Sequence, residues 1–277
     1  MRIRWVSLSI LVMLWGPGLS HAAARPNYYL ALGDSLAIGV QPSASGEDVS
    51  TNQGYADDLY ALFRTRMPRL GLAKLGCSGE TTTTMIEGNI CSYAEGSQLA
   101  AAVSFLETHE VSLVTLDIGA NDIDGCISST GINATCVTTG LNTIGTNLPR
   151  ILAELRNAAR PNTLIVAMNY YDPFLAAWTL GASGQTLAVA SLQATTTFNG
   201  VLKTAYEAFS IPVADVATAY RISDFTFVPV INLPVNVFLT LSWTWMGAPA
   251  PVGPNIHPNA VGYAVIAGTF AEKIAAQ

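Results

Sequence analysis

Residues 28–36 read YYLALGDSL, a short apolar run that stops at Gly33 and continues into a polar turn. An apolar run of this length, ended by a glycine, is typical of a strand that is buried on both faces of a sheet. Further runs of the same kind follow along the chain, at residues 70–75, 111–118 (VSLVTLDI), 163–168 (TLIVAM) and 212–216. The sequence therefore predicts a series of buried strands.

Helical spacing fills the segments between these strands. Apolar residues recur at steps of three and four from Leu141 to Leu155, and we expect Pro149 to kink this helix or to start its second half. Other helices are predicted around residues 59–63, over 99–106, and over 261–274 after a proline. Alternating strands and helices indicate an α/β fold in which helices cover both faces of a parallel sheet.

The composition describes a packed globular protein. Half of the 277 residues are hydrophobic (50%) and only 12% are charged, which is the opposite of the balance found in disordered chains. Thirteen Lys and Arg stand against 19 Asp and Glu, for a net charge of −6, and no basic run occurs. Nucleic acid is therefore not expected as a partner.

Residues 1–24 (MRIRWVSLSILVMLWGPGLSHAAA) resemble a secretory signal peptide. Two arginines precede an apolar run over residues 5–15, which is too short to span a bilayer, and three alanines at 22–24 offer a cleavage site. An uncleaved anchor is the alternative. We expect a secreted, extracellular, monomeric protein whose residues 25–277 form a single domain without an integral membrane segment.

The four cysteines are Cys77, Cys91, Cys126 and Cys136. Export permits disulfides, and four cysteines allow three pairings. Closure of short loops favours Cys77 with Cys91 and Cys126 with Cys136, and the other two pairings stay open. No two cysteines have the spacing of a zinc site, so neither a metal nor another cofactor is expected.

Ser35 follows the first strand, and parallel sheets hold their chemistry in the loops at the carboxyl ends of the strands. A serine at the start of a helical turn is suited to nucleophilic attack, although Asp34 and Ser35 also fit an ordinary helix cap. A serine needs a base. His109 ends a helix and is interpreted as structural, whereas His257, in GPNIHPNAVGY before the last helix, is the predicted base.

Two further loops at strand ends contribute hydrogen-bond donors. Asn121 follows the strand VSLVTLDI, and Gly79 follows the second strand, where a glycine lets a backbone N–H approach a substrate. Asp34 precedes Ser35 and Asp122 follows Asn121, and we expect both carboxylates to hold their loops by hydrogen bonds.

Four motifs in order resemble the SGNH hydrolases, also called GDSL esterases and lipases. They are GDSL at 33–36, Gly79 within GCSGETTTTMI, GAND at 119–122 and HPNAVGY at 257–263. With its paired cysteines, the chain is most similar to the secreted, disulfide-containing bacterial branch. The resemblance implies a three-layer α/β/α sandwich with a central parallel sheet of the flavodoxin-like kind. It also implies Ser35 as nucleophile, His257 as base, and an oxyanion hole made by the backbone N–H of Ser35 and of Gly79 and the side-chain amide of Asn121.

One position departs from the family. The family usually has an Asp three residues before the histidine, where this chain has Pro254, followed by Asn255, and no carboxylate occurs from residue 225 to 271. We therefore expect a Ser–His dyad in which a backbone carbonyl near Pro254 or the side chain of Asn255 orients His257. A distant aspartate, such as Asp215 or Asp224, would instead complete a triad.

Residues 232–245 (NLPVNVFLTLSWTW) alternate between apolar and smaller or polar side chains. A period of two predicts extended chain. This segment is expected either to pack as an extra strand or hairpin, or to form an apolar wall for an acyl chain near His257.

The predicted function is an exported carboxylic ester hydrolase that acts on small-molecule or lipid-like esters. Two alternatives stay open: an esterase that removes O-acetyl groups from carbohydrates, and a binding protein without activity on the same scaffold.

Overall fold

A computed structural model describes residues 27–277. Its centre is a five-stranded parallel sheet in the order β4-β1-β5-β8-β9. The strands span Asn27–Gly33 (β1), Leu70–Lys74 (β4), Glu110–Asp117 (β5), Leu164–Met168 (β8) and Val213–Ala214 (β9). The buried middle of the sheet is formed by β1, β5 and β8, which are the most continuously apolar of the predicted strands. The signal-peptide assignment to residues 1–24 falls outside the described residues.

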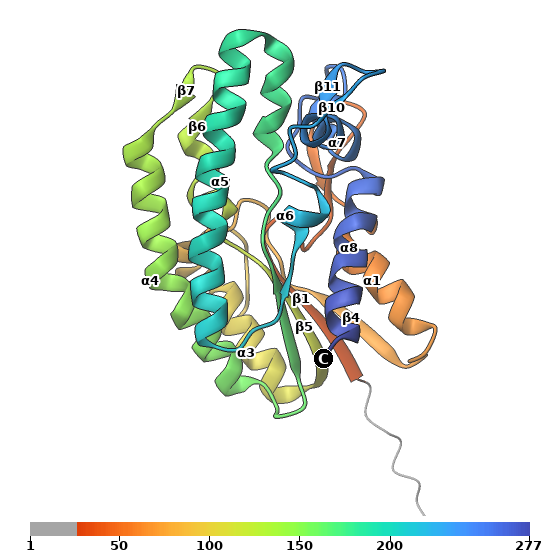
Figure 1. Cartoon of the computed structure of the whole chain (residues 1–277). Coiled ribbons are helices and arrows are strands. Elements are labelled where there is room, and N and C mark those ends of the chain that lie inside the picture. The colour runs from red at the N-terminus through yellow and green to blue at the C-terminus, as the bar shows by residue number, and fades with distance from the viewer. Residues whose placement is uncertain (1–26) are drawn as a thin grey trace, which may run out of the picture.

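Helices cover both faces of the sheet (Figure 1). On one face pack α3 (Gln98–Thr108), α4 (Ala134–Ala158) and α5 (Ala182–Ala208), and on the other pack α1 (Tyr55–Arg64) and α8 (Ala260–Ala275). The strand order places the first strand between the second and the third, as in other doubly wound folds. The predicted three-layer α/β/α fold is therefore confirmed. Pro149 lies inside α4, which continues on both sides of it.

The remaining elements are short. Three helices, α2 (Thr82–Glu87), α6 (Val216–Ala219) and α7 (Val235–Trp243), lie in the connections. Three hairpins pair β2 (Val40–Pro42) with β3 (Asp48–Ser50), β6 (Ile127–Ser128) with β7 (Gly131–Ile132), and β10 (Phe227–Val228) with β11 (Leu233–Pro234).

The expectation of extended chain over residues 232–245 is wrong. Only Leu233–Pro234 is a strand, and the chain then enters α7. Pro234 suits the position before a helix, and the side chains that α7 buries are Asn236, Val237 and Thr240, which share one helical face. Alternation by twos also places apolar residues four apart, so the pattern was compatible with a helix that buries a narrow stripe.

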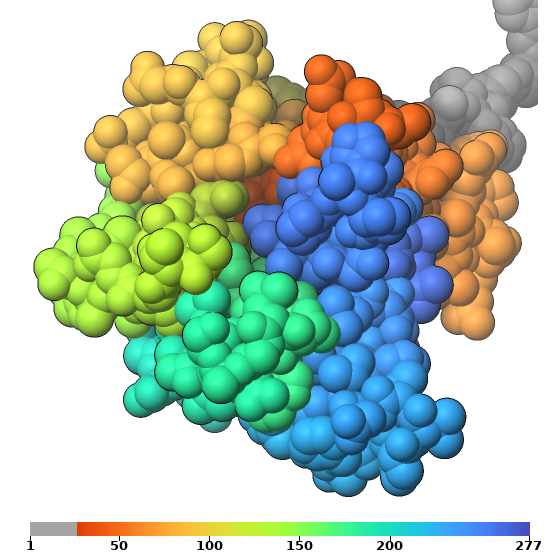
Figure 2. Space-filling model, turned by 90° about the horizontal axis from the view of Figure 1, so that it is seen from above, coloured from red at the N-terminus to blue at the C-terminus, as the bar shows by residue number. Residues whose placement is uncertain are grey.

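The structure forms the disulfides Cys77–Cys91 and Cys126–Cys136, the pairing that loop closure favours. The first bridge lies within the connection from β4 to α3, and the second joins the segment after β5 to the first turn of α4. The same end of the molecule is seen from above in Figure 2, where a hollow opens between the blue segment before α8 and the yellow and lime-green segments. The C-terminus lies at the other end, the end at which β1 starts (Figure 1). Among residues 27–277, no helix combines the length and the apolar character that crossing a bilayer requires.

Candidate active site

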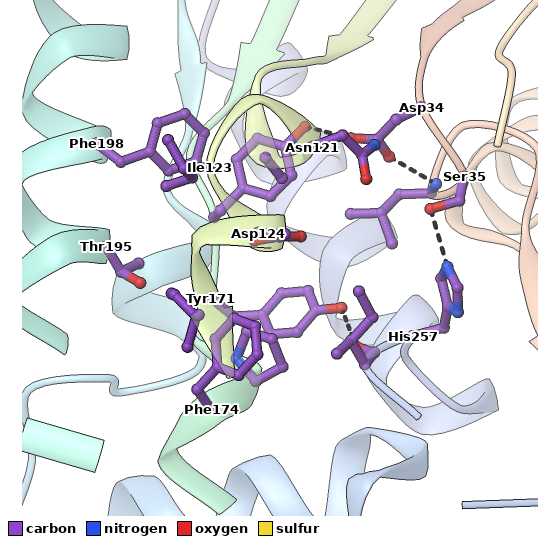
Figure 3. A pocket seen from close by; sticks show the side chains of 16 residues that line it. Asp34, Ser35, Asn121, Ile123, Asp124, Tyr171, Phe174, Thr195, Phe198 and His257 are labelled. Carbon is purple, nitrogen blue, oxygen red and sulfur yellow. Dashed lines mark hydrogen bonds between the residues drawn. The ribbon is translucent and has the colours of Figure 1, made fainter. Parts of the chain in front are cut away.

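Ser35 and His257 meet in the structure although 222 positions separate them in the chain. Ser35 lies in the turn directly after β1, and His257 lies in the loop that leads into α8. The distance from Ser35 Oγ to His257 Nε2 is 2.9 Å, which is a hydrogen bond (Figure 3). Both residues are buried, with 8% and 5% of their surfaces exposed. Ser35 and His257, the predicted nucleophile and base, are therefore in direct contact.

Asp34 holds the Ser35 turn from the protein interior. Its Oδ1 accepts a hydrogen bond from the backbone N–H of Leu36 at 2.9 Å, and its Oδ2 accepts one from the hydroxyl of Tyr170 at 3.0 Å. Its own N–H donates to the backbone oxygen of Asp117 at the end of β5. Burial raises the pKa of Asp34 to about 6. Asp34 thus fixes the turn on both sides of Ser35, as expected.

Asp117 and Gln98 support the same turn, and sequence reasoning identified neither. Asp117 accepts a hydrogen bond from Tyr55, and its pKa is raised well above the ordinary value by burial and by the nearby charge of Asp34. The side-chain amide of Gln98 pairs with both the N–H and the carbonyl of Gly33, at 2.7 and 2.9 Å. A side chain at Gly33 would collide with the backbone of Asp117, so only glycine fits there.

The His257 loop is held by different contacts. Asn255 Oδ1 accepts from His257 Nδ1 at 2.8 Å and from the His257 backbone N–H at 3.0 Å. The hydroxyl of Tyr171 donates to the backbone oxygen of Ile256 at 2.7 Å. Of the two acceptors left open by the sequence, the structure places the Asn255 side chain, and not a carbonyl near Pro254, at Nδ1.

A carboxylate from the β2–β3 hairpin stands behind Asn255. Asp48 Oδ1 accepts from Asn255 Nδ2 at 2.7 Å and lies 3.5 Å from His257 Nδ1. The distant aspartates considered from the sequence are bound elsewhere: Asp215 caps α6 and bonds Asn169, and Asp224 pairs with Arg221. No local signal marked Asp48, because it follows a polar loop far from His257 in the chain.

Burial lowers the pKa of His257, and the charge of Asp48 acts in the opposite direction. The imidazole is therefore neutral at physiological pH, since even its ordinary pKa is about 6.5. A neutral imidazole has one N–H and one lone pair. Because Asn255 Oδ1 can only accept, the proton lies on Nδ1, and the lone pair of Nε2 faces Ser35.

The three predicted oxyanion-hole donors come from the segments that follow β1, β4 and β5. Among the described residues, no group accepts from the backbone N–H of Ser35 or of Gly79. Asn121 donates from Nδ2 to the backbone oxygen of Glu80 at 3.0 Å, which leaves its second N–H free and ties its loop to the turn that contains Gly79. Asn121 lines the same cavity as Ser35, whereas Gly79, at a left-handed φ of 79°, lies outside the cavity lining.

Asp122 also fulfils its predicted role, because its two oxygens accept from the N–H and the hydroxyl of Thr82. This contact fixes the start of α2 against the Asn121 loop. His109 packs against Tyr28 and Phe105 far from Ser35, in agreement with a structural role. Within residues 27–277, no cluster of His, Cys, Asp and Glu side chains is arranged to hold a metal ion.

A cavity of about 550 Å³, its open mouth included, leads away from Ser35 and His257 (Figure 3). Its walls are mainly apolar and aromatic and include Leu36, Ile123, Ile127, Tyr170, Tyr171, Phe174, Phe198 and Ile256. None of residues 232–245 lines it, so α7 does not provide the acyl wall that the alternating pattern suggested. The wall comes instead from the segments after β5 and β8 and from α5.

Asp124 points into this cavity (Figure 3). Among the described residues its carboxyl group has no hydrogen-bond partner, and no Lys or Arg lines the cavity. Burial, together with the charges of Asp34 and Asp172, raises the pKa of Asp124 to about 8. At neutral pH this carboxyl group is therefore largely protonated.

The comparison with known families agrees with the motifs. Residues 31–265 match the model of the GDSL-like lipase/acylhydrolase family. The chain belongs to this family. The match extends from β1 to α8 and so includes Ser35, Asn121 and His257 within one family domain. A search of curated protein sequences finds no match.

Solved structures share the fold of this GDSL-family chain at low sequence identity. An extracellular lipase from Streptomyces rimosus has a TM-score of 0.58 at 19% identity, over 89% of this chain and 99% of its own. A phospholipase A1 from Streptomyces albidoflavus has a TM-score of 0.54 at 19% identity, over 90% and 100%. An acetylxylan esterase from Geobacillus stearothermophilus has a TM-score of 0.52 at 16% identity, over 89% and 93%. These likenesses show a shared fold.

Proposed function

We propose that this GDSL-family chain is a secreted serine esterase that hydrolyses lipid-like carboxylic esters. Ser35 is the nucleophile and His257 is the general base. The observation that carries the proposal is the 2.9 Å hydrogen bond between Ser35 Oγ and His257 Nε2 at the edge of an apolar cavity. A hydroxyl paired with a neutral imidazole is activated for attack on a carbonyl, unlike a serine that only caps a helix.

The proton path follows from the hydrogen bonds. As Ser35 Oγ forms a bond to the ester carbonyl carbon, its proton passes to His257 Nε2. The imidazolium then returns this proton to the departing alcohol, which leaves an acyl group on Ser35. A water molecule then attacks the acyl carbon and gives a proton to Nε2. The imidazolium passes this proton to Ser35 Oγ as the bond between Oγ and the acyl carbon breaks, which releases the carboxylic acid and restores the serine. Asn255 keeps the ring in the tautomer that both steps need.

The negative charge that develops on the carbonyl oxygen needs donors that are already in place. We assign this role to the backbone N–H of Ser35 and of Gly79 and to the free N–H of Asn121. Two observations support the assignment: neither backbone N–H donates to another described group, and Asn121 is tied to the residue after Gly79. Removal of one such donor typically costs about 10²- to 10³-fold in kcat.

The walls of the cavity favour an acyl chain over a sugar. Ile123, Ile127, Phe174 and Phe198 offer apolar surface, and a hydrocarbon chain gains about 0.8 kcal/mol for each buried methylene group. A site for acetylated carbohydrates would need polar groups that bind several hydroxyls. Asp124 and Thr195 are polar side chains in a lining that is otherwise dominated by apolar ones.

The proposal is tested by covalent labelling combined with hydrolysis. A fluorophosphonate should label Ser35, and wild type should hydrolyse p-nitrophenyl esters, faster for medium chains than for acetate. Ser35→Ala should lose both activities, whereas Ser223→Ala, which changes an exposed serine outside the cavity, should retain them. Activity on acetate and acetylated xylan alone would support the carbohydrate esterase. Folded protein without labelling or hydrolysis would support the binding protein.

We further propose that residues 1–24 are removed during export and that the remaining chain acts as a monomeric, extracellular domain. The two disulfides support this proposal, because disulfides are typical of exported proteins. Protein sequencing of the material in the culture medium should find Arg25 as the first residue. Intact chain that stays with the membrane fraction would contradict it.

A further inference from the structure

The side chain of Asn255 has three partners, which together determine how its amide is oriented. Its oxygen faces two donors, Nδ1 and the backbone N–H of His257, and its nitrogen faces the carboxylate of Asp48. An amide rotated by 180° would direct N–H groups at the two His257 donors and its oxygen at a carboxylate. With the proton on Nδ1, every one of these contacts would be unfavourable, and only a change of tautomer would relieve the one at Nδ1.

Asp48 makes this orientation unequivocal because a carboxylate can only accept. Without Asp48, the amide nitrogen of Asn255 would lose the one partner that holds it on the far side from His257. A rotated amide would stabilise the imidazole tautomer with its proton on Nε2, and this tautomer cannot take the Ser35 proton. The tautomer of His257 therefore depends on a residue with which it forms no hydrogen bond.

Asp48 also brings a full negative charge near the imidazole. Its Oδ1 lies 3.5 Å from Nδ1, and among the described residues no other carboxylate comes within 4 Å of the ring nitrogens. The other ionisable groups that line the cavity with His257 are Asp34, Asp124, Tyr170 and Tyr171. The segment from 225 to 271, which contains His257, has no charged residue.

We propose that Asp48 is a positioning residue that replaces the missing triad carboxylate, acting on His257 through the amide of Asn255. This inference rests on the proposed function of Ser35 and His257. The charge of Asp48 stabilises the imidazolium that forms during attack, and its hydrogen bond to Asn255 maintains the productive tautomer. Because 45% of its side-chain surface is exposed, solvent screens this charge more than it would a buried triad aspartate.

Two substitutions separate the two effects. Asp48→Asn keeps an oxygen that can accept from Asn255 but removes the charge, whereas Asp48→Ala removes both. We expect kcat/KM on a p-nitrophenyl ester to fall roughly tenfold in Asp48→Asn and roughly 30- to 100-fold in Asp48→Ala, both well short of the ~10⁴ lost with a wrong tautomer. The loss should lie in kcat, because Asp48 does not line the cavity.

The pH profile gives a readout that a merely structural role would not move. Activity falls at low pH as His257 becomes protonated, and the charge of Asp48 raises the pKa of His257. Loss of that charge should therefore shift the acidic limb of kcat/KM to lower pH, by roughly half a pH unit to one unit. Glu47→Gln is the matched control: it removes the same charge from the adjacent, exposed position and should leave both the rate and the profile unchanged.

Exchange of the two side chains provides a rescue. Asn255→Asp alone places two carboxylates where the structure has a 2.7 Å contact, and its activity should fall. Asp48→Asn combined with Asn255→Asp puts a carboxylate directly at Nδ1, held by the amide of residue 48. This double variant should be more active than either single variant, and its acidic limb should move back to higher pH.

Failure of this inference and failure of the proposed function give different results. If Ser35→Ala retains hydrolysis, the proposed function fails. If Ser35→Ala is inactive while Asp48→Asn and Asp48→Ala keep the wild-type rate and pH profile, only the role of Asp48 is refuted. A shift in Glu47→Gln equal to that in Asp48→Asn would also refute it, since surface charge alone would then account for the shift. Melting temperatures of all variants confirm that each one is folded.

Discussion

The two proposed catalytic side chains are held by opposite parts of the molecule. Ser35 is positioned from the core, where Asp34 and its partner Tyr170 are buried at the end of the sheet. His257 is positioned from the rim, where Asn255 is partly exposed and Asp48 is exposed. Contacts in the core contribute to folding stability as well as to geometry, whereas contacts at the rim can serve geometry almost alone. Variants on the two sides should therefore separate activity from stability.

The largest effect should come from the two residues that meet. His257→Ala should reduce kcat by roughly 10⁴- to 10⁶-fold, about as much as Ser35→Ala, because members of one catalytic unit are strongly non-additive. The variant that lacks both should be no less active than either single variant. Kinetics on one p-nitrophenyl ester measure all three. A double variant with a further large loss would mean that Ser35 and His257 act independently, and the comparison between their supports would lose its basis.

A smaller but still severe effect is expected at the rim. Asn255→Ala should lower kcat by roughly 10²- to 10³-fold, since the imidazole loses the acceptor that fixes its tautomer. Its melting temperature should stay close to that of wild type, because the contacts that are lost lie near the surface. Parallel assays of rate and thermal unfolding test this. A large fall in melting temperature would show that the His257 loop is a structural element as much as a positioning one.

Two adjacent tyrosines offer the sharpest comparison between the sides. Tyr170 donates to Asp34 on the Ser35 side, and Tyr171 donates to the Ile256 carbonyl on the His257 side. Loss of the Tyr170 hydroxyl removes the donor to the buried Oδ2 of Asp34, which costs about 1–3 kcal/mol. Tyr170→Phe should lower the melting temperature by several degrees, and Tyr171→Phe should mainly lower kcat, by roughly three- to tenfold. If both variants changed the melting temperature equally and changed kcat equally, the proposed difference between the Ser35 side and the His257 side would be contradicted.

The smallest effect concerns the pH dependence of stability, which the core side should dominate. Burial raises the pKa of Asp34 to about 6, of Asp172 to about 7 and of Asp124 to about 8, all above the unfolded value of about 3.9. Between pH 4 and 8 the folded protein therefore retains protons that the unfolded chain has released, and stability falls as pH rises. The melting temperature should be at least several degrees higher at pH 5 than at pH 8, and Asp124→Asn should reduce that difference. A melting temperature that is constant or rises over this range would refute the raised pKa values.

Local sequence patterns were sufficient to predict the part of the site that lies in the loops after β1 and β5. An apolar strand followed by Gly33, Asp34 and Ser35 is contiguous, and so is the strand that ends before Asn121. The strand order then brings these loops together without further information, because parallel strands place their carboxyl ends on one edge. His257 could be assigned because the segment after residue 24 contains only one other histidine.

The partners of these residues could not be predicted in the same way. Asp48 and Asn255 are 207 positions apart and meet through two irregular loops, whose paths no hydrophobic period describes. Tyr170 and Asp34 are 136 positions apart, and a tyrosine after a buried strand gives no sign of its partner. For the residues of α7, alternation by twos predicted extended chain. The same spacing also satisfies the four-residue steps of a helix, and the sequence alone does not distinguish the two. Side-chain partners from distant segments require the fold before they can be assigned.

Gln277 and the mouth of the cavity lie at opposite ends of the molecule (Figure 1). α8 begins close to His257 and runs along the sheet, so that Gln277 lies at the end of the molecule where β1 starts, opposite to the cavity (Figure 1). A resin, electrode or fusion partner attached through Gln277 would therefore sit behind the sheet and leave the mouth of the cavity facing the medium. Attachment through the β2–β3 hairpin would instead place the linker against Asp48, at the rim of the site. The C-terminal route is thus the better one for display or immobilisation of this protein.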